Sequence, residues 1–225
     1  MKRISLVRIC AIAAAILAVA AVPAAAMIIE LGQTKTPLVA PTCPPGVAPK
    51  FCTIVLTEVT ALETIRDGTA YPTKVKQPGY IVAWTVGLSI ISNNQKAERG
   101  VIHYFDGLYG TARAGIVVLK PVGRHRLFKW QGVAASPIVH VQPYFGQVVQ
   151  FVLLKPLRVV PGETIALTIP TWAPVLSIGL ATKPFAYRQS RTTDCNNATT
   201  PPPSAQAVGQ TVVYGCNYPG NRVEY

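Results

Sequence analysis

The sequence predicts an all-β fold: an antiparallel, jelly-roll-like β-sandwich that follows an N-terminal signal helix. Short segments rich in β-branched residues recur along the chain, turn-forming residues separate them, and 20 prolines are spread through the 225 residues. Because an interior proline costs a helix about 3 kcal/mol, we expect no long helix beyond the signal. Short strands punctuated by turns are typical of sandwiches and jelly rolls.

Residues 79–91, GYIVAWTVGLSII, carry the clearest strand pattern. Apolar residues alternate there with period two, which predicts one buried face. That face holds five apolar side chains: Val82, Trp84, Val86, Leu88 and Ile90. Further strands are expected at residues 51–59, 114–121, 147–159, 163–170, 174–182 and 210–216.

The first 26 residues have the pattern of a secretory signal peptide. Lys2, Arg3 and Arg8 precede an uncharged apolar run at residues 9–22, and three alanines end at Ala26, where we expect cleavage. The run is shorter than the roughly 20 apolar residues that span a bilayer, although a short uncleaved anchor is the alternative. No second run of that length follows. We therefore expect a secreted protein, extracellular or attached to the cell surface, without a membrane span after cleavage.

The rest of the chain divides into a lead-in and one domain. Residues 27–50 are rich in Pro, Thr and Ala, which predicts an extended lead-in with little structure of its own. Residues 51–225 form a single β-sandwich domain in this interpretation, because a chain of this length can bury a proper core. Within it, residues 187–210 are polar and include three successive prolines, which predicts a long surface loop.

Four cysteines follow the predicted signal: Cys43, Cys52, Cys195 and Cys216. An even number in an exported chain indicates disulfides, and three pairings are open. We favour Cys43–Cys52 and Cys195–Cys216, because each pair is close in sequence and near one end of the chain. We expect no metal site and no cofactor, since no CxxC occurs and no histidine lies near a cysteine in sequence.

The charge of the chain favours anionic partners. After the signal, 18 basic residues stand against 9 acidic ones, a net charge of +9. Such a charge attracts anionic surfaces but says nothing about the fold. Acidic or neutral polysaccharides of the cell envelope are the expected partners, and a solvated basic surface without a ligand is the alternative. We expect no nucleic-acid partner, because the chain is exported and has no recognised reading motif.

Three segments carry a resemblance to known proteins. They are the aromatic strand that opens at Pro78-Gly79, the strand that ends in Leu119-Lys120-Pro121, and residues 155–167, where Val160-Pro161-Gly162-Glu163 precedes Ile165. Together they resemble a group of secreted, largely uncharacterised β-sandwich proteins of actinobacteria, over roughly residues 75–182. These are turn and strand signatures. The resemblance implies a jelly-roll-like fold and export, and it implies no established activity.

The acidic residues do not form a recognisable catalytic motif. There is no G-x-S-x-G, and the nine acids after the signal are scattered. Asp67 and Glu163 stand beside glycines in predicted turns, which favours structural roles. His103 and Asp106 would point to opposite faces if their segment were a strand. A secreted hydrolase that uses such carboxylates is the second hypothesis for function.

The stretch GRHRLFKWQG, residues 123–132, is the candidate binding surface. Period two puts Arg124, Arg126, Phe128 and Trp130 on one face of a strand. Arginines beside aromatics suit stacking on sugar rings or clamping an acidic group. Alternatively, Phe128 and Trp130 cover the edge of the core while the arginine stems lie over them, and the pattern by itself favours this interpretation.

The sequence leads to three hypotheses for function. The first is a secreted, non-catalytic protein that binds an anionic or carbohydrate polymer at the cell envelope. The second is the secreted polysaccharide or ester hydrolase. The third is a structural or interaction protein with no small ligand, whose proline-rich ends tether it to partners.

Overall fold

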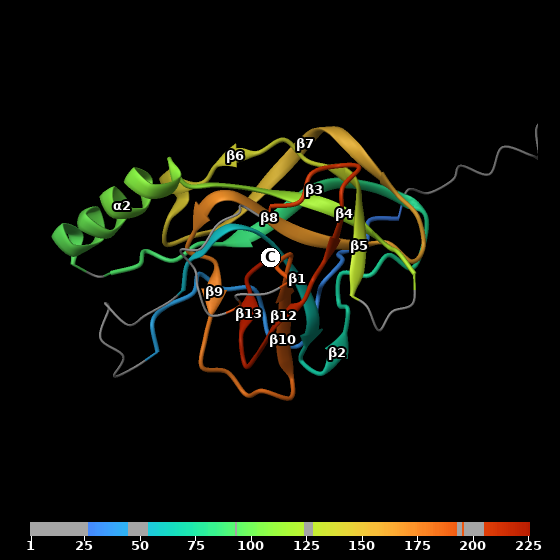
Figure 1. The fold of residues 1–225 in the computed structure, drawn as a ribbon, viewed down its shortest axis with the longest axis horizontal. Coiled ribbons are helices and arrows are strands. Elements are labelled where there is room, and N and C mark those ends of the chain that lie inside the picture. The colour runs from blue at the N-terminus through green and yellow to red at the C-terminus, as the bar shows by residue number, and fades with distance from the viewer. Residues whose placement is uncertain (1–26, 45–53, 93, 124–127, 193–194, 196–204) are drawn as a thin grey trace, which may run out of the picture. The chain divides into compact units, whose positions relative to one another are not determined.

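The computed structural model describes residues 27–44, 54–92, 94–123, 128–192, 195 and 205–225. The chain forms two units, Met1–Glu30 and Leu31–Tyr225, and every described helix and strand belongs to the second unit (Figure 1). The predicted signal, residues 1–26, lies outside the described residues. No described helix has both the length and the apolar character that a membrane crossing requires.

A curled antiparallel sheet forms the centre of the second unit (Figure 1). Its path through space is β11 (Thr211–Val213), β5 (Lys129–Ala135), β4 (Arg113–Pro121), β8 (Thr164–Ala173), β1 (Leu56–Arg66), β10 (Phe185–Gln189) and β12 (Cys216–Pro219). Two short strands extend it: β2 (Thr69–Ala70) pairs with β1, and β6 (Val139–His140) pairs with β4. Separate antiparallel pairs are β3 (Gly79–Gly87) with β7 (Val148–Val159), and β9 (Leu176–Ser177) with β13 (Arg222–Val223). The predicted all-β, sandwich-like fold is confirmed.

Two apolar clusters cover the two faces of the large sheet. Ile116 and Val118 of β4 pack in the first cluster together with Trp84 of β3. The alternate residues Val117 and Leu119 pack in the second cluster. Because successive side chains of a strand point to opposite faces, the sheet separates the two clusters.

The predicted face of residues 79–91 is correct for Trp84, Val86 and Leu88, which are at most 7% exposed. It is wrong for Val82, which is 53% exposed. The pairing of β3 with β7 shifts register between Ile81 and Ala83, and such a bulge turns the side chains before it to the other face. Ile90, also exposed, lies beyond the end of β3.

Helix α2 (Gln95–Tyr109), of 15 residues, corrects the expectation that no long helix follows the signal. Asn94 caps it, because its Oδ1 accepts hydrogen bonds of 3.0 Å from the amides of Lys96 and Ala97. The helix projects from the strands (Figure 1), and none of its residues is fully buried. Its apolar pattern was therefore weak, and two internal glycines weakened the helical signal further.

The C-terminal strands were largely missed in the sequence. β10 takes residues 187–189 from the predicted loop, and β12 and β13 are short and partly polar. The disulfide between Cys195 and Cys216 is present as predicted. Cys43 is also disulfide-bonded, and its expected partner Cys52 lies outside the described residues.

The lead-in has no helix or strand in its described part, residues 27–44, but it is held by hydrogen bonds. Thr36 donates to Asp67 from its amide at 2.7 Å and from its hydroxyl at 2.6 Å. Pro37 accepts a bond of 3.0 Å from Arg222, and the amide of Val39 donates to Glu224 at 3.4 Å. The segment from Leu31 to Val39 is therefore a bound strap, and we call it the N-terminal strap.

Candidate ligand-binding site

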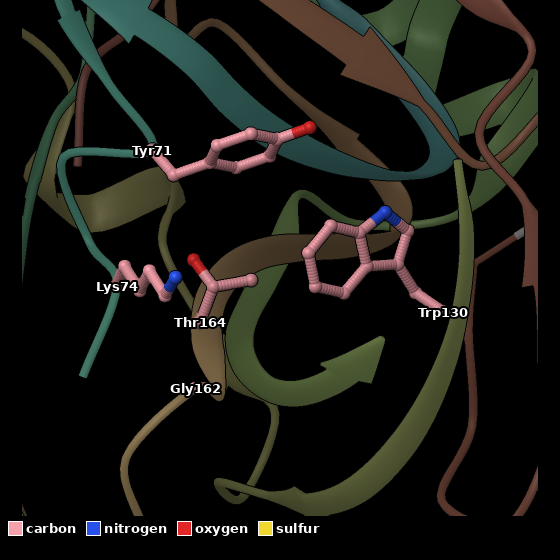
Figure 2. A pocket seen from close by; sticks show the side chains of 5 residues that line it. All are labelled: Tyr71, Lys74, Trp130, Gly162 and Thr164. Carbon is pink, nitrogen blue, oxygen red and sulfur yellow. The ribbon is translucent and has the colours of Figure 1, made fainter. Parts of the chain in front are cut away.

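A small pocket opens beside the second apolar cluster. Its lining comes from three parts of the chain: Tyr71 and Lys74 follow β2, Trp130 belongs to β5, and Gly162 and Thr164 lie at the start of β8 (Figure 2). Figure 2 shows the ring of Tyr71 and the indole of Trp130 facing each other across this space. Their ring centroids are 5.8 Å apart and their planes are inclined at 51°.

Trp130 presents the six-membered ring of its indole to this pocket, and its N–H lies on the side of the ring away from Lys74 and Thr164 (Figure 2). The side chain is only 4% exposed, and its indole Nε1 has no hydrogen-bond partner among the described residues. Buried indole N–H groups usually find a partner, because an unpaired buried donor carries its full desolvation penalty.

Tyr71 is held in a strained backbone conformation. Its φ is +46°, a region that residues other than glycine rarely occupy. Two backbone bonds of 2.9 Å fix it there: its amide donates to Thr64, and its carbonyl accepts from the amide of Lys74. Burial raises the pKa of the Tyr71 hydroxyl, while Arg188 nearby lowers it. The hydroxyl therefore stays protonated at neutral pH and can donate a hydrogen bond.

Polar groups lie beside the pocket, although the surface of the pocket itself is mostly apolar. The hydroxyls of Thr73 and Thr164 are 3.0 Å apart, and Thr73 donates to the carbonyl of Ile165 at 2.8 Å. Thr73 and Thr164 are buried, whereas Lys74 is exposed. The ammonium group of Lys74 is thus available to an anionic ligand without losing a described ion pair.

The predicted site residues are placed only in part. Arg124 and Arg126 lie outside the described residues. Phe128 is half-buried and packs in the same cluster as Trp130. The arginine that stacks on Phe128 is Arg188 of β10, whose guanidinium carbon is 3.5 Å from the ring centroid.

Arg188 is fixed in this position by the backbone. It donates hydrogen bonds of 3.0 Å to the carbonyls of Tyr214 and Gly215, which hold its cationic group over the ring of Phe128. The pKa of Arg188 is lowered by burial, an effect opposed by Tyr71. Arg188 was missed because the sequence placed it in a loop, and only the pairing of β10 with β1 and β12 brings it here.

The carboxylates of the hydrolase hypothesis have structural contacts. Asp106 lies on α2 and accepts the indole N–H of Trp172 at 2.9 Å, which fastens the helix to β8. Glu163 accepts the amide of Val160 at 2.8 Å within the turn before β8, as its place in the sequence predicted. His103 and Asp106 are on a helix, not on a strand. Among the described residues, no three His, Cys, Asp or Glu side chains gather as a metal site requires.

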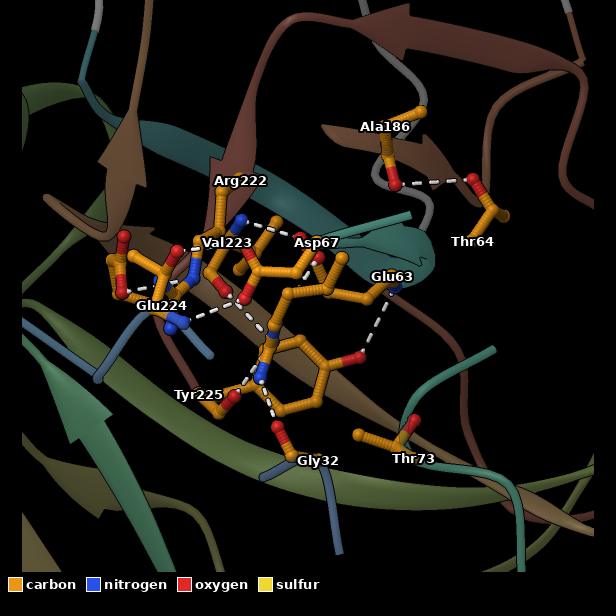
Figure 3. Close-up of polar contacts among 12 residues, drawn as sticks. Gly32, Glu63, Thr64, Asp67, Thr73, Ala186, Arg222, Val223, Glu224 and Tyr225 are labelled. Atoms are coloured by element: carbon orange, nitrogen blue, oxygen red, sulfur yellow. Dashed lines mark hydrogen bonds and ion pairs between the residues drawn. The ribbon is translucent and has the colours of Figure 1, made fainter. Parts of the chain in front are cut away.

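A second polar cluster lies where β1 meets the C-terminal residues (Figure 3). Glu63 is fully buried, 3.4 Å from Arg66, and accepts the amide of Val223 at 2.6 Å. Arg222 and Glu224 form a second buried pair at 3.3 Å. Burial raises the pKa of Glu63 to about 7, although Arg66 and the Val223 amide lower it. These contacts join β1 to β13 and to the N-terminal strap, which indicates a structural role.

Comparison with family models, with curated proteins and with solved structures gives no match for this chain. The site is therefore interpreted from its own geometry.

Proposed function

We propose that this chain is a secreted, non-catalytic β-sandwich protein that binds an anionic or carbohydrate polymer of the cell envelope. The observation that carries the proposal is the pocket in which the rings of Tyr71 and Trp130 lie together with the exposed Lys74. Aromatic rings offer apolar faces to sugar rings, and Lys74 suits an acidic substituent. The net charge of +9 after the signal supports an acidic polymer over a neutral one.

Retention on immobilised polymers is the test. Residues 27–225 are applied to purified cell wall and to neutral and acidic polysaccharides, at low and at high salt. We expect retention on an acidic polymer that weakens with salt but does not disappear, because a shaped site adds contacts that salt does not screen. Retention lost completely at high salt would reduce the proposal to simple adhesion. No retention at all would favour the structural hypothesis.

Two pairs of variants separate the pocket from general charge. Lys74→Gln and Lys76→Gln remove the same charge from the same exposed segment, but only Lys74 lines the pocket. Trp130→Phe and Trp84→Phe each remove a buried, unpartnered indole N–H, but only Trp130 lines the pocket. We expect the first member of each pair to weaken binding about three- to tenfold, because Lys74→Gln removes one ionic contact and Trp130→Phe removes part of the aromatic surface that lines the pocket. Equal effects within either pair would remove the site assignment.

A further inference from the structure

The pair β3–β7 has one buried face and one face that is apolar but exposed. Trp84 and Val86 of β3 and Leu153 and Val159 of β7 point inward and are at most 8% exposed. The opposite face carries five large apolar side chains. Their exposed fractions are 67% for Tyr80, 53% for Val82, 46% for Val148, 73% for Val152 and 103% for Leu154. We call these five residues the outer apolar face. Exposed apolar side chains that gather on one face of a strand pair mark a contact site more often than scattered single residues do.

A bulge in β7 creates the most exposed part of this face. Ile81 pairs with Leu157 and Ala83 with Val152, so residues 153–156 of β7 stand opposite a single residue of β3. The extra residues include Leu154, which has no contact that reduces its exposure, and Pro156, which cannot donate to a neighbouring strand. Bulges often redirect a side chain next to a functional site, and they are selected features of a fold and not defects. Here the bulge presents a leucine to the surroundings.

The charges on the same strands have one sign. Lys155 and Arg158 are exposed, and Arg158 lies directly across from Tyr80. The segments 79–87 and 148–159 contain no aspartate or glutamate. A second copy of this face would bring Lys155 and Arg158 near their own counterparts, which like-charge repulsion opposes. An anionic lipid surface offers the complementary combination of negative headgroups and an apolar interior.

We propose that the outer apolar face docks on the surface of an anionic phospholipid membrane. Leu154 and Val152 enter the boundary between headgroups and acyl chains, Tyr80 lies at that boundary, and Lys155 and Arg158 contact lipid phosphates. Docking is peripheral, and both strands stay paired. This surface is distinct from the Trp130 pocket, and the inference does not rest on the proposed polymer binding.

Co-sedimentation with vesicles tests the docking. Residues 27–225 are mixed with vesicles of phosphatidylcholine alone, or of phosphatidylcholine and phosphatidylglycerol in equal parts. We expect binding to the mixed vesicles only, and a weaker but measurable fraction bound at high salt, because the apolar contacts are not screened. No binding to the mixed vesicles would overturn the proposal. Equal binding to both kinds would overturn the role of charge in it.

Matched variants locate the contact. Leu154→Ser and Leu108→Ser remove exposed leucines, one from the outer apolar face and one from α2, and neither loses core packing. We expect Leu154→Ser to lower the vesicle partition coefficient about tenfold and Leu108→Ser to leave it unchanged. Lys155→Gln is expected to weaken binding more than Lys183→Gln, which removes an exposed charge elsewhere. Unchanged binding by Leu154→Ser would refute the assignment.

Two further measurements distinguish other outcomes. Light scattering without vesicles reports self-association: a dimer that Leu154→Ser abolishes would show that a second copy covers the face, and would overturn the membrane proposal. Trp130→Phe should bind vesicles like the unaltered chain. Failure of polymer binding with intact vesicle binding would refute the proposed function alone, and the reverse result would refute the membrane docking alone.

Discussion

Glu63→Gln tests the electrostatics of the buried polar cluster. Glu63 has no exposed surface, and burial raises its pKa from 4.5 to about 7. Between these two pH values the folded protein keeps a proton on Glu63 that the unfolded chain has lost. The free energy of unfolding therefore falls as pH rises through this window, and the loss is nearly complete at pH 7.

The size of the effect follows from the two pKa values. Each pH unit between 4.5 and 7 is worth about 1.4 kcal/mol, so ionisation of Glu63 costs the folded state about 3 kcal/mol. The pKa of Glu224 is also raised by burial, and this adds in the same direction. For Asp67, desolvation raises the pKa, but hydrogen bonds from Thr36 outweigh it and bring the pKa down to about 2. Asp67 therefore stabilises the fold above its unfolded pKa, and that stability is lost only in more acidic solution, outside this window.

Urea unfolding followed by tryptophan fluorescence at pH 5 and pH 8 measures this difference. We expect the unaltered protein to be less stable at pH 8 by about 3 kcal/mol, and Glu63→Gln to lose most of that dependence. The amide cannot ionise, and its oxygen can still accept the Val223 N–H. Glu30→Gln, which changes an exposed acid, should keep the full pH dependence. Stability that rises between pH 5 and pH 8, or a Glu63→Gln variant with undiminished pH dependence, would refute this reasoning.

Three other substitutions test separate parts of the fold. Gly87→Ala would place a Cβ 1.8 Å from the carbonyl oxygen of Val39. We expect the free energy of unfolding to fall by about 1–3 kcal/mol and the N-terminal strap to be cleaved faster by proteases. An unchanged rate of proteolysis would contradict this contact. Cys195→Ser combined with Cys216→Ser removes a disulfide between residues 21 apart in sequence, and it should lower the free energy of unfolding in urea by about 3 kcal/mol. Under reducing conditions the unaltered chain also loses this disulfide, so the difference between the two proteins should be smaller. Asn94→Ala removes the cap of α2 and should cost about 1 kcal/mol, visible as faster amide hydrogen exchange confined to that helix.

The alternation of apolar residues along a strand predicted which side chains are buried wherever the strand is regular. Alternation placed Trp84 and Val86 in the core, because period two holds wherever a strand is regular. It misplaced Val82, because a bulge depends on the partner strand and leaves no mark in the strand it shifts. Helix α2 escaped notice because Tyr104 and Leu108 are exposed apolar residues that blur its apolar face.

In the candidate site, too, the sequence identified a residue in a distinctive local stretch and missed those that only tertiary pairing brings together. Trp130 was identified because it lies in an aromatic, basic stretch of sequence. Tyr71, Lys74 and Arg188 reach it only through pairings between segments far apart in the chain, and the residues around each have no distinctive pattern. Contacts of this kind are set by tertiary packing, which one sequence does not reveal.

The N-terminal strap has a consequence for the order in which the protein matures. Its bonds to Arg66 and Asp67 use residues at the end of β1 and just after it. The bonds of Pro37 and Val39, however, end on Arg222 and Glu224, which lie 185 residues further along the chain. A polypeptide that emerges from the N-terminus onward therefore exposes this part of the strap long before these two partners exist. Contacts between residues so far apart in sequence form more slowly than local ones. The part of the strap around Pro37 and Val39 therefore cannot take its final place until residues 222–225 have been made.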